Sequence, residues 1–184
     1  MAKPLSKEDI KKISKLPAVK KVTEAGRIYY SEEFQEHFLE EYSAHGKPTR
    51  IFREAGLTPE LIGYKRIERA TARWKEKARK EAEGQRMRAC ADALVDWTLE
   101  GDGFYKMKQL LSQNVKNRDD AFQLLDAMEH IFRDLLLGKD TRGKFFRPEE
   151  TMRSVSLLEE ARRDLVWKVN YNYALKNLLI KIGK

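Results

Sequence analysis

The sequence predicts an all-α fold with one short hairpin near residues 22–30. Ten glycines and five prolines are few for 184 residues, so long segments contain no residue that breaks a helix. Apolar residues recur three and four positions apart along these segments, which is the period of a helix with one buried face. Strand character is confined to residues 22–30, where β-branched and aromatic residues lie on both sides of Gly26.

Residue types that start and stop helices divide the first part of the chain. Ser31 precedes two glutamates, so a hydroxyl cap and two carboxylates lie where the free amides of a helix start favour them. This first helix ends before the Gly-Lys-Pro-Thr sequence at residues 46–49. A short second helix over residues 51–55 is stopped by Gly56, because glycine tolerates the left-handed conformation of a helix end.

A further start signal leads toward a basic helix. Thr58 can cap a helix, and Pro59 suits its first position. After Gly63, a helix is expected from Tyr64 to Lys80, where no glycine or proline occurs. Its apolar residues, Trp74 among them, fall on one stripe, while most of the others are charged.

The second half of the chain predicts a helical bundle. Breaks are expected at residues 101–103, at residues 138–148 and around Asn170, where residues that end helices or form turns gather. The boundary between two domains is placed near residues 80–84, which gives domains of residues 1–80 and 82–184. The helices of the second domain are expected at Met87–Leu99, Phe104–Ser112, Asp119–Leu137, Ser156–Trp167 and Tyr171–Ile182.

Positive charge is concentrated just before this boundary. The chain carries a net charge of +8, and residues 1–83 contain 19 basic and 14 acidic residues. Between Tyr64 and Lys80, eight basic residues stand against only two acidic ones. Such a helix favours binding to a polyanion, and double-stranded DNA is the natural candidate. The alternative is a solvated helix face without a ligand.

The first domain carries a resemblance to a known DNA-binding module. Two short helices before a basic one, joined by a glycine turn, are the arrangement that presents a recognition helix to the major groove. With the segments Tyr30–Phe34, Ile51–Leu57 and Arg73–Lys75, residues 28–76 resemble the amino-terminal helix-turn-helix of bacterial insertion-sequence transposases. The resemblance implies a set of residues at the phosphate backbone or in a groove: Thr49, Arg50, Arg53, Lys65, Arg66, Arg69, Arg73 and Lys75.

The second domain resembles a different family. Its motifs are Ile131–Leu137, Leu157–Leu165, Val169–Asn172 and Leu175–Ile182. With these motifs, residues 82–183 resemble the carboxy-terminal collar domain of the delta-prime subunit of the bacterial DNA polymerase III clamp loader. The resemblance implies a helical module that packs laterally against like domains and does no chemistry. In that family an ATPase-type module precedes the collar, so this chain is either a natural recombination of two modules or a fusion.

Several features that are typical of catalytic or cofactor sites are incomplete. Residues 138–145 nearly form a phosphate-binding loop, but Phe145 occupies the position that needs a hydroxyl to hold magnesium. Cys90 lies between two alanines and is expected to be a buried hydrophobic residue. The three histidines lack the spaced partners of a metal site or a catalytic triad. We therefore expect no cofactor, no metal, no catalytic residue and no enzymatic activity.

Aromatic residues of the second half are expected in the core instead of on a base-stacking platform, because large apolar residues are most often buried. For Tyr171 and Tyr173 two placements stay as alternatives: they line an exposed contact, or they cover the end of the bundle. The residues expected in the core are Trp97, Phe104, Tyr105, Phe122, Phe132 and Trp167.

The favoured function is that of a non-enzymatic DNA-binding protein whose second domain forms a homo-oligomer or docks onto clamp-loader-type proteins. One alternative is a DNA-replication component with a basic amino-terminal tether, and another is a structural helical scaffold. No run approaches the roughly 18 apolar residues of a membrane-spanning helix, and Met1–Ser6 contains no apolar stretch of a signal sequence. The cytoplasm is the expected compartment, with no membrane partner.

Overall fold

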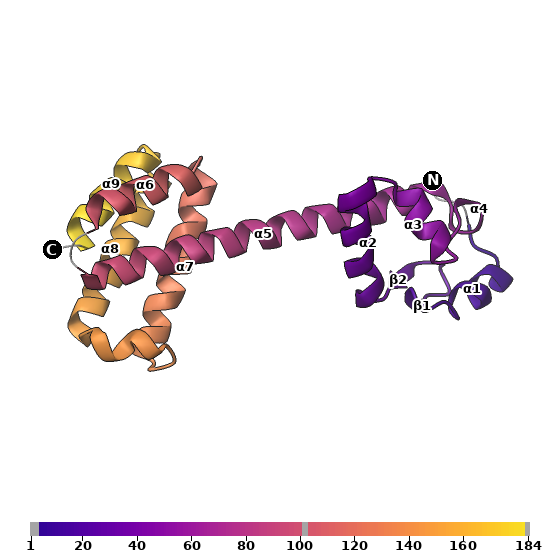
Figure 1. Cartoon of the computed structure of the whole chain (residues 1–184), viewed down its shortest axis with the longest axis horizontal. Helices are drawn as coiled ribbons and strands as arrows, with labels where there is room; N and C mark the ends of the chain where they lie inside the picture. Colours follow the sequence, from indigo (N-terminus) through magenta and orange to yellow (C-terminus); the bar gives the residue numbers. More distant parts are fainter. Residues whose placement is uncertain (1–3, 101–102, 183–184) are drawn as a thin grey trace. The chain divides into compact units, whose positions relative to one another are not determined.

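The computed structural model describes residues 4–100 and 103–182. Within these residues the chain is mostly helical, with nine α-helices, one 3-10 helix and one two-stranded sheet. The predicted helical class is therefore confirmed, and the predicted hairpin is present. The chain divides into two compact units between Lys80 and Glu81, here called unit 1 and unit 2 (Figure 1).

Unit 1 contains the hairpin and the short helices. Its elements are α1 (Lys7–Ile13), β1 (Val19–Val22), β2 (Ile28–Tyr30), α2 (Glu32–His45), α3 (Pro48–Glu54), α4 (Pro59–Ile62) and the first part of α5 (Tyr64–Glu100). The two strands are antiparallel, and the hairpin begins three residues before its predicted start. Helix α1 is not among the predicted elements. It is held by a capping box, in which the Asp9 amide donates to Ser6 Oγ at 3.0 Å and the Ser6 amide donates to Asp9 Oδ2 at 3.2 Å.

The predicted caps at Ser31 and Thr58 and the stop at Gly56 agree with the structure, whereas the predicted start of the second helix at residue 51 is wrong. Helix α3 begins at Pro48, because proline suits the first helical position. Ser31 Oγ accepts a hydrogen bond from the amide of Phe34, and Thr58 Oγ1 accepts one from the amide of Leu61. Gly56 has a φ of +76°, and the chain turns there after α3. These local signals fix the order of helices that leads into α5.

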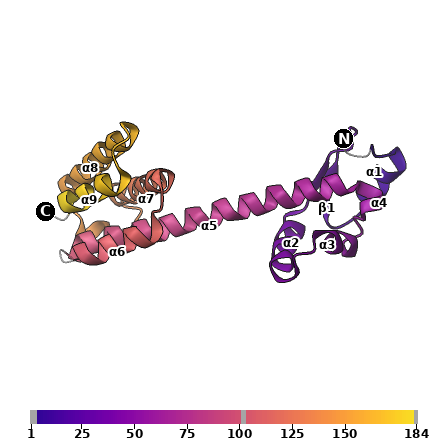
Figure 2. The same cartoon turned by 90° about the horizontal axis from the view of Figure 1, so that it is seen from above.

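The two predicted helices Tyr64–Lys80 and Met87–Leu99 are one helix, α5, in the structure. It is one continuous helix of 37 residues, with Gly84 in its interior (Figure 2). A glycine inside a helix costs only about 1 kcal/mol relative to alanine, and the neighbouring lysines, glutamates and alanines are strong helix formers. The first part of α5 belongs to the core of unit 1 and its last part to the core of unit 2.

Aromatic rings around Trp74 form the core of unit 1. The Trp74 ring lies 5.0 Å from the ring of Tyr30 and 5.0 Å from that of Phe38, and it stacks on Phe52 at 5.7 Å between centroids. These three residues come from β2, α2 and α3. Trp74 therefore joins α5 to the hairpin, α2 and α3, and the predicted apolar stripe of α5 faces this core.

Unit 2 is a bundle that continues from α5. Its further elements are α6 (Phe104–Asn114), α7 (Arg118–Leu136), the 3-10 helix η1 (Thr141–Phe145), α8 (Pro148–Val166) and α9 (Tyr171–Ile182). Helix α8 packs against both α7 and α9. It starts eight residues before its predicted beginning at Ser156, because Pro148 opens the helix instead of preceding it. At the first helical position the missing N–H of proline costs no hydrogen bond.

The prediction that six aromatic residues lie in this core is partly wrong. Phe132 is fully buried, and Trp97 and Phe122 pack against the core as partly buried residues. Tyr105 and Trp167, however, are 83% and 77% exposed, and Phe104 is also exposed. Phe104, Tyr105 and Trp167 lie at helix ends, where the spacing of apolar residues does not assign a face. Cys90 is buried as expected, and burial raises the pKa of its thiol to about 11.

The segment that resembles a phosphate loop forms η1 and is tied to α5. The Arg142 guanidinium lies 3.0 Å from Asp92, 2.8 Å from Asp96 and 2.6 Å from Asp140. Its hydrogen bonds lower the pKa of the Asp140 carboxyl. A helix, α7, precedes the segment in place of the strand that a phosphate loop requires. Arg142 thus has a structural role in this loop.

Among the helices in residues 4–100 and 103–182, none combines the length and the apolar character needed to cross a bilayer.

Candidate nucleic-acid interface

The predicted contact residues of α3 have carboxylate partners nearby. Arg50 Nε donates to Glu54 Oε1 at 2.8 Å, and Arg53 Nη2 donates to Glu60 Oε1 at 2.5 Å. Both pairs lie on the surface, while Thr49 in the first turn of α3 is half-buried. The structure therefore places these residues beside one another, with the charge of each arginine locally balanced.

The predicted residues of α5 divide into two groups. Lys65, Arg69 and Arg73 are exposed and follow one another at intervals of four, so they share one face of the helix. None of these three forms a salt bridge with a carboxylate of the described residues. Lys75 instead lies against α2, where its Nζ is 4.9 Å from the centroid of the Tyr42 ring and 3.4 Å from the Tyr42 hydroxyl.

Arg66 connects three segments of unit 1. Its Nη1 donates to the carbonyl of Ile62 at 2.8 Å, and its Nη2 donates to the carbonyl of Gly26 at 3.3 Å. The first bond reaches the end of α4, and the second reaches the turn of the hairpin. Arg66 therefore holds the hairpin turn beside the start of α5.

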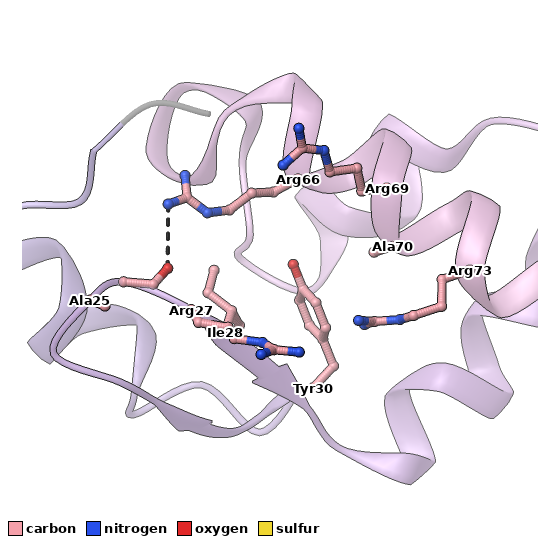
Figure 3. A pocket seen from close by; sticks show the side chains of 9 residues that line it. Ala25, Arg27, Ile28, Tyr30, Arg66, Arg69, Ala70 and Arg73 are labelled. Atoms are coloured by element: carbon pink, nitrogen blue, oxygen red, sulfur yellow. Dashed lines mark hydrogen bonds between the residues drawn. The ribbon is translucent and has the colours of Figure 1, made fainter. Parts of the chain in front are cut away.

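The hairpin turn and α5 together form an open pocket of about 370 Å³ (Figure 3). Three arginines of α5 line it, and Arg27 of the hairpin adds a fourth guanidinium group. No acidic residue is among its lining residues, which are Ala25, Gly26, Arg27, Ile28, Tyr30, Arg66, Arg69, Ala70 and Arg73. The pocket brings together three of the predicted contact residues and leaves the residues of α3 outside.

Tyr30 contributes a polar group to the pocket. Its ring packs on Trp74, while its hydroxyl points toward the arginine side chains of α5 (Figure 3). Burial raises the pKa of this phenol to about 12, although the nearby charges of Arg66 and Arg73 act in the opposite direction. The hydroxyl is therefore a neutral hydrogen-bond donor at neutral pH.

Arg27 and Tyr30 are not among the contact residues predicted from the sequence. Neither lies on the basic helix, and only the packing of the hairpin against α5 brings them to it. The signal available in the sequence is a basic residue next to Gly26 in the predicted turn, 39 positions before Arg66. Periodicity on one helix carries no information about such a partner.

This arrangement favours the binding of anions. Arginine stays protonated in proteins and presents a planar set of donors that matches phosphate oxygens. Within the residues that the structure describes, no group of three or more His, Cys, Asp or Glu side chains could hold a metal ion. The groups that are present can bind and orient a phosphate.

Comparison with known proteins yields no match to a protein-family model, to a curated protein or to a solved structure.

Proposed function

We propose that the protein is a non-enzymatic DNA-binding protein of the cytoplasm, in which unit 1 contacts duplex DNA through Lys65, Arg69 and Arg73 of α5. One observation carries the proposal: three exposed cations without carboxylate partners in the described residues follow one face of a helix. Arg27 extends this positive surface from the hairpin. Clustered Lys and Arg side chains bind phosphates and release condensed counterions, which favours association.

The order of helices supports α5 as the helix that approaches DNA. Helices α3 and α4 precede it, with Gly56 and Gly63 at the two junctions, and short helices that lead through a glycine turn into a basic helix are the arrangement of a helix-turn-helix. Arg50 and Arg53 are included in the proposed interface with Thr49. Their ion pairs lie on the surface, where salt bridges add little stability, so a phosphate can replace the carboxylate.

The test is a titration of the full chain against a labelled short duplex at two salt concentrations. If only Lys65, Arg69 and Arg73 each neutralise one phosphate, the association constant is expected to fall about 40-fold between about 50 and 200 mM salt, and contacts by Arg50 and Arg53 would steepen the fall. This decrease follows from the linear dependence of log K on log salt. Absence of binding at the lower salt concentration, or an affinity that salt does not change, would contradict the proposed function.

We propose a second role for unit 2, which is self-association of the chain. Exposed apolar side chains lie around the junction of α8 and α9, namely Val166, Trp167 and Tyr173. Exposed apolar side chains that form a patch are typical of interaction surfaces, and the collar resemblance implies lateral packing of like domains. Docking onto clamp-loader-type proteins is the alternative use of this surface.

Light scattering of the full chain over a range of concentrations checks this role. The mass is expected to rise with concentration, and Trp167→Ser is expected to reduce the rise because it removes the largest exposed apolar side chain. Tyr105→Ser, at another exposed aromatic residue, is the matched control. A monomeric mass at every concentration would show that this surface does not join two copies.

A further inference from the structure

The pocket beside α5 has the size of a site for a small ligand. Its volume of about 370 Å³ lies at the lower end of the roughly 300 to 1,000 Å³ that such pockets span. One wall is the hairpin turn at residues 25–28, and the other is the face of α5 that carries Arg66, Arg69 and Arg73. The pocket is open to solvent, so a group at the end of a larger molecule can enter it.

The pocket carries a concentrated positive charge. Four guanidinium groups line it, and its lining contains no carboxylate. Arg66 is engaged with two backbone carbonyls, and Arg27 lies 5.1 Å from the centroid of the Tyr29 ring. Arg69 and Arg73 make no hydrogen bond or salt bridge to other described residues. Their side chains extend toward the pocket from one face of the helix (Figure 3).

The Tyr30 hydroxyl is the second observation that points to a ligand. The residue is only 7% exposed, and its hydroxyl is directed into the pocket (Figure 3). Among the described residues no group accepts or donates a hydrogen bond at this oxygen. The ring is buried while the hydroxyl faces the open pocket, so the hydroxyl is available to donate a hydrogen bond to an acceptor bound there.

We propose that this pocket binds a phosphate monoester group, with Arg69, Arg73 and the Tyr30 hydroxyl as its donors. A monoester carries nearly two negative charges at neutral pH and three terminal oxygens, whereas a phosphodiester inside a DNA strand carries one charge. Several guanidinium groups and one hydroxyl match the first better than the second. This inference goes beyond the proposed function, because it requires no contact along the duplex.

A phosphate monoester group can reach the pocket from two sources. One is a 5′-phosphate at the end of a DNA strand, and the other is a small phosphorylated molecule. The chemistry that the pocket recognises is the same in both cases. Two arms of one experiment distinguish them.

The first arm measures the binding of thymidine 5′-monophosphate to the full chain by calorimetry, with thymidine as the probe that lacks the phosphate. The nucleotide is expected to bind, and thymidine is expected not to bind. Binding is expected to strengthen as the pH rises through about 6, where the monoester becomes a dianion, while the Tyr30 hydroxyl, with its pKa raised to about 12, stays a donor.

The second arm compares duplexes that end in a 5′-phosphate or a 5′-hydroxyl and are otherwise identical. A preference for the phosphorylated duplex supports the pocket and assigns the strand end as its source. Equal affinities together with binding of the mononucleotide support the pocket and assign a small phosphorylated molecule.

Tyr30→Phe is the variant that isolates the pocket, since it removes the hydroxyl and keeps the ring that packs on Trp74. Loss of one hydrogen bond to a charged group is expected to weaken phosphate binding about ten-fold. Tyr29→Phe, next to it in β2 and exposed, is the matched control. A thermal melt of each variant checks that unit 1 remains folded.

Two results would overturn the inference. One is the absence of nucleotide binding together with equal affinities for the two duplexes. The other is phosphate binding that Tyr30→Phe leaves unchanged. In either case salt-dependent binding of the hydroxyl-ended duplex would still support the proposed function, so the two failures can be told apart.

Discussion

Trp74→Ala is expected to lower the free energy of unfolding of unit 1 by about 3 to 5 kcal/mol, the usual cost of removing a large buried aromatic side chain. Trp74 is 2% exposed and packs against Tyr30, Phe34, Phe38 and Phe52. Alanine leaves a cavity where α5 meets the hairpin, α2 and α3. Since native domains are stable by only about 5 to 15 kcal/mol, much of the stability of unit 1 would be lost.

The two separate cores allow this effect to be localised. The core of unit 2 contains neither Trp74 nor its aromatic partners, so the unfolding transition of that unit is expected to stay in place. Fluorescence of Trp97 and Trp167 follows unit 2 in the variant, and circular dichroism follows both units. Tyr105→Ala, at an 83% exposed residue, is the control and should change stability by no more than about 0.5 kcal/mol. Equal losses in both units, or no greater loss than in the control, would contradict this assignment of the core.

Simultaneous replacement of Lys65, Arg69 and Arg73 by alanine is expected to weaken duplex binding about 100-fold or more near 0.1 M salt. Each phosphate contact there contributes roughly 1 kcal/mol through counterion release. The three side chains are exposed and make no salt bridge within the described residues, so the melting temperature is expected to change little. The affinity should therefore fall in a protein that remains folded.

The control for this variant removes the same charge from unit 2. Lys106, Lys108 and Lys176 are exposed residues of α6 and α9, and their replacement by alanine also lowers the net charge by three. If unit 1 holds the interface, this control retains most of the affinity. If the control loses as much affinity as the variant with alanine at Lys65, Arg69 and Arg73, then net charge alone, and not the face of α5, determines binding.

Local signals predicted much of the fold. The caps at Ser31 and Thr58 and the turn at Gly56 depend on residues within three or four positions, and each is present. The stripe that contains Trp74 follows from helical periodicity. Some local signals were misread. The predicted gap between Lys80 and Met87 is helical in α5, and Pro148 opens α8 instead of closing a loop.

The candidate site depends on contacts that are distant in the sequence. Lys65, Arg69 and Arg73 could be selected because they recur on one helix face. Arg27 and Tyr30 could not, because their position beside α5 results from packing on Trp74 and from the bond between Arg66 and the carbonyl of Gly26. The pairing of Arg50 and Arg53 with nearby glutamates also becomes visible only in the structure.

The salt dependence of duplex binding tests the central claim most directly. The logarithm of the association constant is plotted against the logarithm of salt concentration for the full chain, for the variant with alanine at Lys65, Arg69 and Arg73, and for the unit 2 control. If the three side chains contact phosphates, the slope of the variant is smaller in magnitude by about 2.7, at about 0.9 for each contact, while the control keeps the slope of the unaltered chain. Equal slopes for the unaltered chain and the variant would contradict the assignment of α5 as the DNA-binding surface.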